Sequence, residues 1–131
     1  MTRIVLVGVD GSDSSRRAAR RAAELAADMG AVLHVMMASE RSTLHRTAAS
    51  EAAEATARAV AAELTGLVAQ VTSSPLQGKP ALALVEEADR LHADVIVVGN
   101  RGTQGVGRVL GSVASAVVAH APCDVFVVKT V

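Results

Sequence analysis

The residues best suited to chemistry in this chain lie in a glycine-rich stretch between a strand and a helix. Four β-branched apolar residues, Val95–Val98, predict a strand buried on both faces. The next thirteen positions hold five glycines and two arginines: Gly99, Arg101, Gly102, Gly105, Gly107, Arg108 and Gly111. Ser112, a favoured helix-capping residue, then opens a helical pattern. Glycine backbone can approach an anion closely and a helix N-terminus attracts it, so the stretch predicts a phosphate-binding loop. A connection without a ligand is the alternative, because a glycine cluster alone is a weak motif.

Two common phosphate motifs do not fit this loop. Gly102 and Gly107 have the spacing of a Walker A loop, but Arg108-Val109 stands where that motif needs lysine and a hydroxyl residue. Gly105 and Gly107 begin a dinucleotide fingerprint, but its third glycine would fall at Leu110. The sequence therefore favours another kind of nucleotide or phosphate loop.

A carboxylate lies at the end of a second buried strand. The apolar run from Arg3 onwards ends at Asp10, and turn-forming residues follow it. In parallel sheets, ligands bind beyond the carboxyl ends of the strands, where the strand order reverses. If the two strands are neighbours, Asp10 and Gly99 face one crevice. The alternative for Asp10 is a turn or a helix cap.

Strand and helix patterns alternate along the chain. Strands are predicted at 3–10, 31–38, 68–74, 95–98 and 124–129, and helices at 14–29, 47–67, 81–91 and 112–120. This alternation predicts a three-layer α/β/α sandwich with a mostly parallel sheet, in which the third strand lies nearer an edge.

Several side chains carry more specific expectations. His34 is predicted to be a core or sheet-edge histidine, and the residues from Pro75 to Pro80 are predicted to form a turn, with Pro80 opening a helix. In that helix, Leu82 is placed on the buried face and Glu87 in water. The arginines at 16, 17, 20 and 21 are interpreted as a solvated helix face.

Composition restricts the class of protein. The 131 residues are expected to form a single domain, 1–131, whose core is aliphatic because Phe126 is the single aromatic residue. Thirteen basic residues balance thirteen acidic ones, which argues against a nucleic-acid partner. No apolar run reaches about 18 residues, which argues against a membrane partner. With no signal-peptide pattern and only Cys123, the sequence favours a soluble cytoplasmic domain.

Four segments together resemble the universal stress protein family: Val7–Ser12, Val95–Gly102, Gly111–Val113 and His120–Lys129. The resemblance covers essentially the whole chain and is most specific in its last third. It implies a Rossmann-like fold, similar to adenine nucleotide alpha hydrolases, with a five-stranded parallel sheet in the order 3-2-1-4-5. It also implies a homodimer joined through the last strand, at Val125–Val128.

The resemblance also implies a nucleotide site. ATP-binding members carry glycine, two residues, glycine, nine residues and then glycine with serine or threonine. This chain has eight residues between Gly102 and Gly111, and its extra glycines could absorb the difference. By this resemblance Asp10 lies near the ribose and a metal-bound phosphate, while Gly8 and Val9 form the floor of the crevice. The backbone at Val35 meets adenine, and a cradle for ribose and phosphate is formed by Gly99, Gly102, Gly111, Ser112 and Val113.

Three functions remain open at this point. The first is a stress-response regulator that binds ATP, or AMP or cyclic AMP, with or without Mg²⁺. The second is a dimeric stress protein that binds no nucleotide and acts through protein partners. The third is a slow ATPase, which has the least support because the four histidines lie outside both candidate loops and no catalytic residue is predicted.

Overall fold

The computed structural model describes residues 2–39, 48–100 and 110–130. Strands and helices alternate along the chain, as the hydrophobic pattern predicts. In chain order the elements are β1 (Ile4–Gly8), α1 (Asp13–Met29), β2 (Val32–Ser39), α2 (Ala48–Leu64), β3 (Val71–Gln77), α3 (Pro80–Leu91), β4 (Val95–Asn100), α4 (Ser112–His120) and β5 (Asp124–Lys129).

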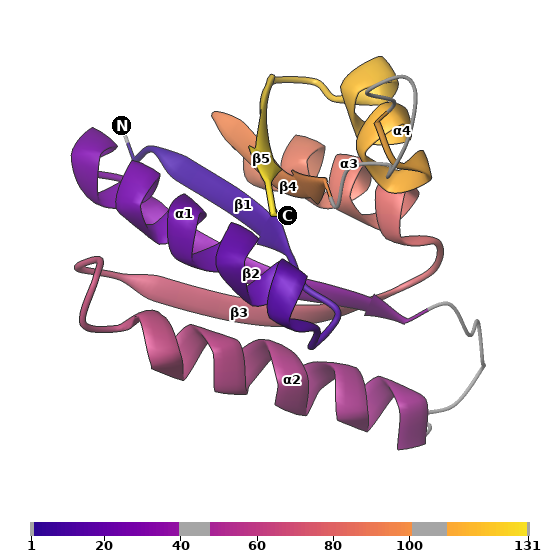
Figure 1. Cartoon of the computed structure of the whole chain (residues 1–131), viewed down its shortest axis with the longest axis horizontal. Helices are drawn as coiled ribbons and strands as arrows, with labels where there is room; N and C mark the ends of the chain where they lie inside the picture. Colours follow the sequence, from indigo (N-terminus) through magenta and orange to yellow (C-terminus); the bar gives the residue numbers. More distant parts are fainter. Residues whose placement is uncertain (1, 40–47, 101–109, 131) are drawn as a thin grey trace.

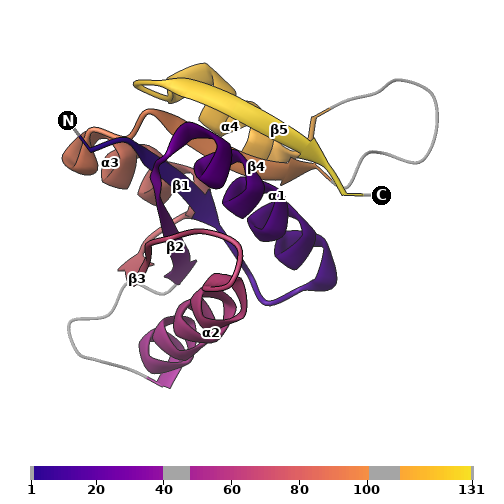
Figure 2. The same cartoon turned by 90° about the vertical axis from the view of Figure 1, so that its left-hand side faces the viewer.

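The five strands form one parallel sheet in the order β3-β2-β1-β4-β5. Helices α1 and α2 cover one face of the sheet, and α3 and α4 cover the other (Figures 1 and 2). The fold is therefore the three-layer α/β/α sandwich with the order 3-2-1-4-5 that was expected. Because β1 pairs with both β2 and β4, the strand order reverses beside β1.

Apolar side chains on both faces of the central strands hold the layers together. Val5, Leu6 and Val7 of β1 are fully buried, and so are Ile96 and Val97 of β4. On α1 the buried positions are all alanines, Ala18, Ala19, Ala22, Ala23 and Ala26, which lets this helix lie close to the sheet. The helix begins where the Ser12 side chain accepts a hydrogen bond from the Ser15 backbone N–H, and it ends at Gly30 in the left-handed conformation.

The third strand differs from its predicted position. It runs over Val71–Gln77 and includes Pro75, which was expected in a turn. Pro75 is opposite Met37 of β2, and β3 lies at one edge of the sheet, where a missing N–H on the outer side disrupts no ladder. The prediction that this strand lies at an edge is confirmed, as is Pro80 at the start of α3.

The buried face of α3 differs in part from the predicted one: Ala88 is buried as expected, but Leu82 is not. Leu82 is 56% exposed, whereas Leu84 is 4% exposed. Glu87, expected in water, is 2% exposed and lies against polar groups of β2 and β3. Those partners explain how a carboxylate can be buried on this helix.

None of the helices in the described ranges is both long enough and apolar enough to cross a membrane.

Candidate functional site

A cavity of about 410 Å³ lies at the carboxyl ends of β1 and β4, where the strand order reverses. Its wall includes residues from both predicted loops, so Asp10 and Gly99 do face one hollow. The described residues that line it are Gly8, Val9, Asp10, Ser12, Ser14, Ser15, Met36, Pro80, Leu84, Val98, Gly99, Asn100, Gly111, Ser112, Val113 and Ala114.

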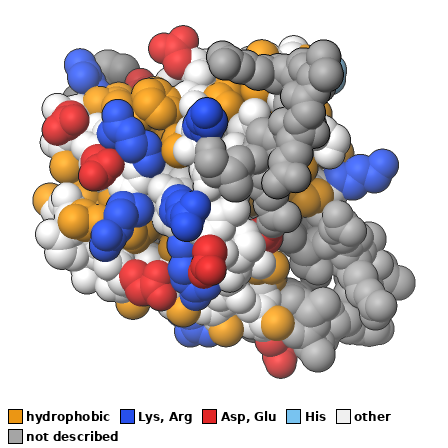
Figure 3. Space-filling view, viewed as in Figure 1, with side chains coloured by type: hydrophobic (Ala, Val, Ile, Leu, Met, Phe, Trp, Pro, Cys, Tyr) orange, Lys and Arg blue, Asp and Glu red, His pale blue; other side chains and the backbone are white. Residues whose placement is uncertain are grey.

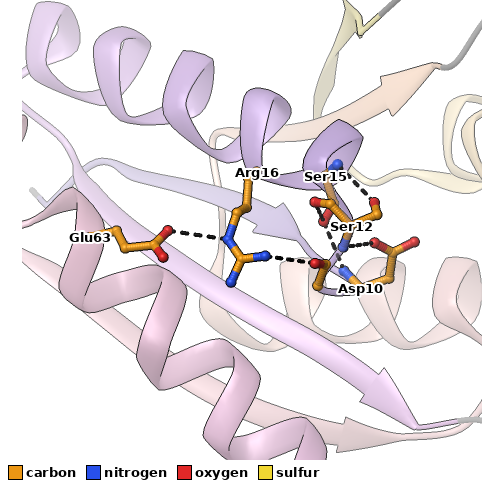
Figure 4. Close-up of polar contacts among 6 residues, drawn as sticks. Asp10, Ser12, Ser15, Arg16 and Glu63 are labelled. Carbon is orange, nitrogen blue, oxygen red and sulfur yellow. Dashed lines mark hydrogen bonds and ion pairs between the residues drawn. The ribbon is translucent and has the colours of Figure 1, made fainter.

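The turn after β1 is held by its own hydrogen bonds (Figure 4). The Ser12 backbone N–H donates to Asp10 Oδ1 at 2.9 Å, and the Asp10 N–H donates to Ser15 Oγ at 3.2 Å. Ser15 Oγ in turn donates to the Ser12 carbonyl at 3.0 Å. Gly11 has φ +86°, a backbone conformation that glycine adopts without strain. These contacts fix the Asp10 carboxylate at the mouth of the cavity.

The first arginine of α1 also supports this turn, and it does not line the cavity. Arg16 Nη1 donates to the Gly11 carbonyl at 2.7 Å, and its Nε lies 3.4 Å from Glu63 Oε2 on α2. Figure 4 shows the guanidinium between the turn and α2. Basic and acidic side chains are interspersed on the face that α1 and α2 cover, as expected of a solvated face (Figure 3).

At the end of β4 the backbone passes very close to its neighbours. A Cβ atom at Gly99 would lie 3.2 Å from Ala18 Cβ and 3.2 Å from Thr130 Cγ2. Only glycine fits here without a shift of α1 or of the segment after β5. Packing therefore favours glycine at this position, whatever the cavity holds.

The start of α4 forms another part of the cavity wall. Asn100 Oδ1 accepts a hydrogen bond from the Gly111 N–H at 3.1 Å and so ties the end of β4 to the start of α4. Gly111 is the N-cap, and the first helical residues, Ser112 and Val113, line the cavity. Backbone N–H groups at a helix N-terminus have no partner within the helix and carry partial positive charge, so this wall suits an anion.

Seven of the eleven predicted site residues line the cavity: Gly8, Val9, Asp10, Gly99, Gly111, Ser112 and Val113. Val35 is fully buried in the core on the α1 and α2 side, and the next residue, Met36, lines the cavity instead. Arg101, Gly102 and Gly105 lie outside the described residues. The predicted ligand roles of all eleven residues stay predictions.

Nine lining residues were not predicted. Asn100, the polar residue that ends β4, could have been found from the sequence in the same way as Asp10. The serines at 12, 14 and 15 follow Asp10 in the same turn. Pro80 and Leu84 of α3 carried no signal, because only the packing of α3 on the sheet brings them to the cavity.

The cavity combines an apolar side with a polar rim. Val9, Met36, Leu84 and Val98 supply aliphatic surface, whereas hydroxyl groups, the Asn100 amide and helix N–H groups supply hydrogen bonds. In the described part of the chain, no three His, Cys, Asp or Glu side chains gather closely enough to hold a metal ion. The arrangement suits a small ligand with one apolar ring system and one hydroxylated or anionic part.

A second polar region lies between α3 and the strands β2 and β3. We call it the His34–Glu87 cluster; its members are His34, Thr72, Ser74, Glu87 and Arg90. His34 Nδ1 lies 2.6 Å from Thr72 Oγ1, and His34 Nε2 lies 2.8 Å from Ser74 Oγ. Ser74 Oγ donates to Glu87 Oε2 at 3.3 Å, and Arg90 pairs with Glu87 Oε1.

The pKa of His34 and the pKa of Glu87 are both lowered in this cluster. Burial lowers the pKa of His34 below its usual value, although the nearby Glu87 carboxylate opposes that shift. The hydrogen bond from Arg90 lowers the pKa of Glu87, against the effect of burial.

The chain matches the family model described as the universal stress protein family over residues 1–129. A universal stress protein of Thermus aquaticus, from the 3′ region of a QAH/OAS sulfhydrylase gene, is 40% identical and aligns with 98% of this chain and 100% of its own length. A solved universal stress protein in complex with cAMP is 37% identical, with 98% of both chains covered and a TM-score of 0.79. The universal stress protein of Archaeoglobus fulgidus in complex with dAMP is 27% identical, with 98% of both chains covered and a TM-score of 0.81.

Proposed function

The chain belongs to the universal stress protein family, and from this premise we propose that its cavity binds an adenine nucleotide and that the protein acts as a stress-response regulator. ATP is the nucleotide we expect first, with AMP and cyclic AMP as the other candidates. Mg²⁺, if it takes part, would be held by Asp10 and the phosphates of the nucleotide, since Mg²⁺ commonly takes one or two carboxylates together with substrate phosphates and water.

The observation that carries this proposal is the meeting of Asp10, Gly99 and the α4 N-terminus around one cavity. Its volume of about 410 Å³ falls within the range of about 300–1,000 Å³ common for small-molecule sites. Two similar structures, at TM-scores of 0.79 and 0.81, are complexes with cAMP and dAMP.

The residues that line the cavity offer three kinds of contact to the proposed nucleotide. The aliphatic side chains of Val9, Met36 and Leu84 would cover the base, because an adenine ring buries apolar surface. Hydroxyl groups near Asp10 would meet the sugar. The N–H groups that open α4 at Ser112 and Val113 would meet the phosphate, because a helix N-terminus attracts anions.

Signalling through this site would use a second copy of the chain. Strand β5 lies at one edge of the sheet, and its residues Val125–Val128 are only partly buried. An apolar edge strand has unpaired backbone groups that favour pairing with another strand. We propose a homodimer through this edge, acting in the cytoplasm.

Titration with ATP, ADP, AMP and cyclic AMP, followed by calorimetry and thermal unfolding, tests the proposal. A nucleotide at 100 times its Kd stabilises the folded state by about 2.7 kcal/mol. We expect a clear rise in Tm with at least one of the four. No heat and no rise with any of them would overturn nucleotide binding and favour action through protein partners.

A pair of substitutions on α4 locates the site. Val113→Glu places a carboxylate at the cavity, in a first helical turn where an acidic residue is tolerated. Its repulsion of phosphate should weaken nucleotide binding by about tenfold or more. The matched control is Val118→Glu, at another exposed valine of the same helix that does not line the cavity. Equal affinity in both variants would place the nucleotide elsewhere.

A further inference from the structure

The segment after β5 touches the cavity wall from behind. Thr130 is 3% exposed and does not line the cavity, yet it contacts three residues that do. Its Oγ1 lies 2.6 Å from Ser14 Oγ and 3.2 Å from the Asn100 carbonyl, and its Cγ2 lies where a side chain at Gly99 would point.

The backbone of Thr130 is held on both sides. Its N–H donates to the Asn100 carbonyl at 3.1 Å, which continues the pairing of β5 with β4. Its carbonyl accepts from Arg17 Nη1 of α1 at 2.9 Å. The hydroxyl is therefore fixed in place by α1 and β4 before any ligand arrives.

The Asn100 carbonyl decides which of the two hydroxyl groups, Ser14 or Thr130, donates to the other. The Asn100 carbonyl can only accept, so Thr130 must give its single hydroxyl proton to it for that contact to be a hydrogen bond. Thr130 Oγ1 then has no proton left for Ser14, so the contact of 2.6 Å requires Ser14 to donate. One order satisfies both contacts: Ser14 donates to Thr130, and Thr130 donates to Asn100.

This order decides what Ser14 offers to a ligand. Ser14 lines the cavity, and because its proton points to Thr130, its hydroxyl oxygen has lone pairs alone to offer there. A ligand hydroxyl can donate a hydrogen bond to such an oxygen. A phosphate oxygen at the same place has no proton to donate, so the two oxygens would repel each other.

We propose that Thr130 is a positioning residue that takes up the Ser14 proton and leaves the Ser14 hydroxyl as an acceptor alone, so that this part of the wall takes a sugar hydroxyl of the nucleotide and not its phosphate. The inference rests on the proposed nucleotide binding and assigns one part of the ligand to one wall. It also connects the segment that follows β5 to the cavity through the side chain of Thr130.

The test compares AMP with 2′,3′-dideoxy-AMP, which lacks both ring hydroxyls, by calorimetry. In the unaltered protein we expect AMP to bind more tightly, by roughly three- to tenfold, the effect of one net hydrogen bond. Thr130→Val keeps the shape and the γ-methyl group but removes the hydroxyl, so the Ser14 proton is no longer held away from the ligand and the ratio of the two affinities should fall. Thr130→Ser keeps the hydroxyl and should keep most of the ratio.

Two further variants separate this role from a purely structural one. Ser14→Ala removes the acceptor itself and should also lower the ratio, which keeps the test decisive if Thr130→Val does not fold. Thr65→Val, a matched change at an exposed position of the chain, should leave the ratio unchanged. Because the readout is a ratio within one variant, a general loss of stability does not produce the expected result.

Each outcome has one meaning. Equal binding of the two nucleotides to the unaltered protein, an unchanged ratio in Thr130→Val, or an unchanged ratio in Ser14→Ala would overturn the inference and leave nucleotide binding intact. No binding of AMP, ADP, ATP or cyclic AMP to the unaltered protein would overturn the proposed function, and this inference with it.

Discussion

Two polar regions of this molecule lie on the same sheet and differ in what their side chains face. In the His34–Glu87 cluster the polar groups bond to one another between α3 and the strands β2 and β3. At the end of β1 and β4, hydroxyl and N–H groups line a cavity of about 410 Å³. Polar groups with mutual partners stabilise the fold, whereas groups around a hollow can bind something else.

Helix α3 belongs to both regions. Pro80 and Leu84 line the cavity, and Glu87, one turn further on, enters the cluster. Among the described residues, every buried side-chain polar atom has a hydrogen-bond partner. The comparison therefore predicts that changes in the cluster lower stability with little effect on ligand binding, and that changes at the cavity rim do the reverse.

The largest expected effect comes from Glu87→Ala. The substitution leaves a space beside His34 and Ser74 and removes the carboxylate that both side chains contact. The free energy of unfolding should therefore fall by about 2–4 kcal/mol. Urea unfolding measures the loss, and Glu86→Ala, at the exposed neighbouring position, is the control. A nucleotide Kd that stays within about twofold supports the separation of the two regions, while a tenfold loss would show that α3 couples them.

Gly99→Ala should affect both properties, because this glycine is packed tightly and also lines the cavity. The added Cβ would lie 3.2 Å from Ala18 Cβ and from Thr130 Cγ2. We expect destabilisation of about 1–3 kcal/mol from overpacking, together with weaker nucleotide binding. Gly66→Ala is the control, since a Cβ there would meet nothing within 4 Å. Full retention of stability would show that the neighbours of Gly99 move easily.

Acidification should lower stability through the cluster. The pKa of His34 is lowered in the folded protein, so below its ordinary value the unfolded chain binds a proton that the folded chain does not. The pKa of Glu87 is also lowered, so its contribution is present above its ordinary value and is lost as the pH falls further. The groups around His34 are Glu87 and Arg90 of α3 and Thr72 and Ser74 of β3.

Urea midpoints measured between pH 7.5 and pH 4 follow this loss. We expect a first decrease below the ordinary pKa of histidine and a steeper one in the range where carboxyl groups titrate. In His34→Gln the first decrease should be much smaller. The same decrease in the variant and in the unaltered protein would assign it to other residues.

The smallest expected effect on stability comes from Ser112→Ala at the cavity rim. Ser112 is exposed and the α4 N-cap is Gly111, so the free energy of unfolding should change by less than about 0.5 kcal/mol. Nucleotide affinity should fall by roughly three- to tenfold if its hydroxyl donates to the ligand. Ser112→Thr, which keeps a hydroxyl, should bind nearly as well; a loss in both variants would point to shape and not to the hydrogen bond.

Much of the fold could be predicted from local patterns. The β-branched run at Val95–Val98 predicts most of β4, and the turn residues around Asp10 follow shortly after β1, so residue types alone place a glycine and a carboxylate near the carboxyl ends of two strands. Alternation of strands and helices gave the α/β class, but the strand order came from the family resemblance. Periodicity says that strands exist, and it does not say which strands are neighbours.

The predictions were wrong where burial or pairing depends on a contact between residues that are far apart in the sequence. The amphipathic pattern of α3 allows more than one buried face, and Glu87 was expected in water. His34 of β2 and Ser74 of β3 make its burial possible. Pro75 was expected in a turn because proline breaks ladders, but an edge strand tolerates it.

By itself, the sequence determined the elements, the residues at the ends of β1 and β4, and the type of chemistry those residues can do, because propensity, capping and turn geometry act within a few positions. Only the tertiary structure decided that Asp10 and Gly99 line one cavity, that Pro80 and Leu84 join them, and that Ser14 meets Thr130, 116 positions away. Such contacts depend on how whole layers pack, and no local pattern of residues records that packing.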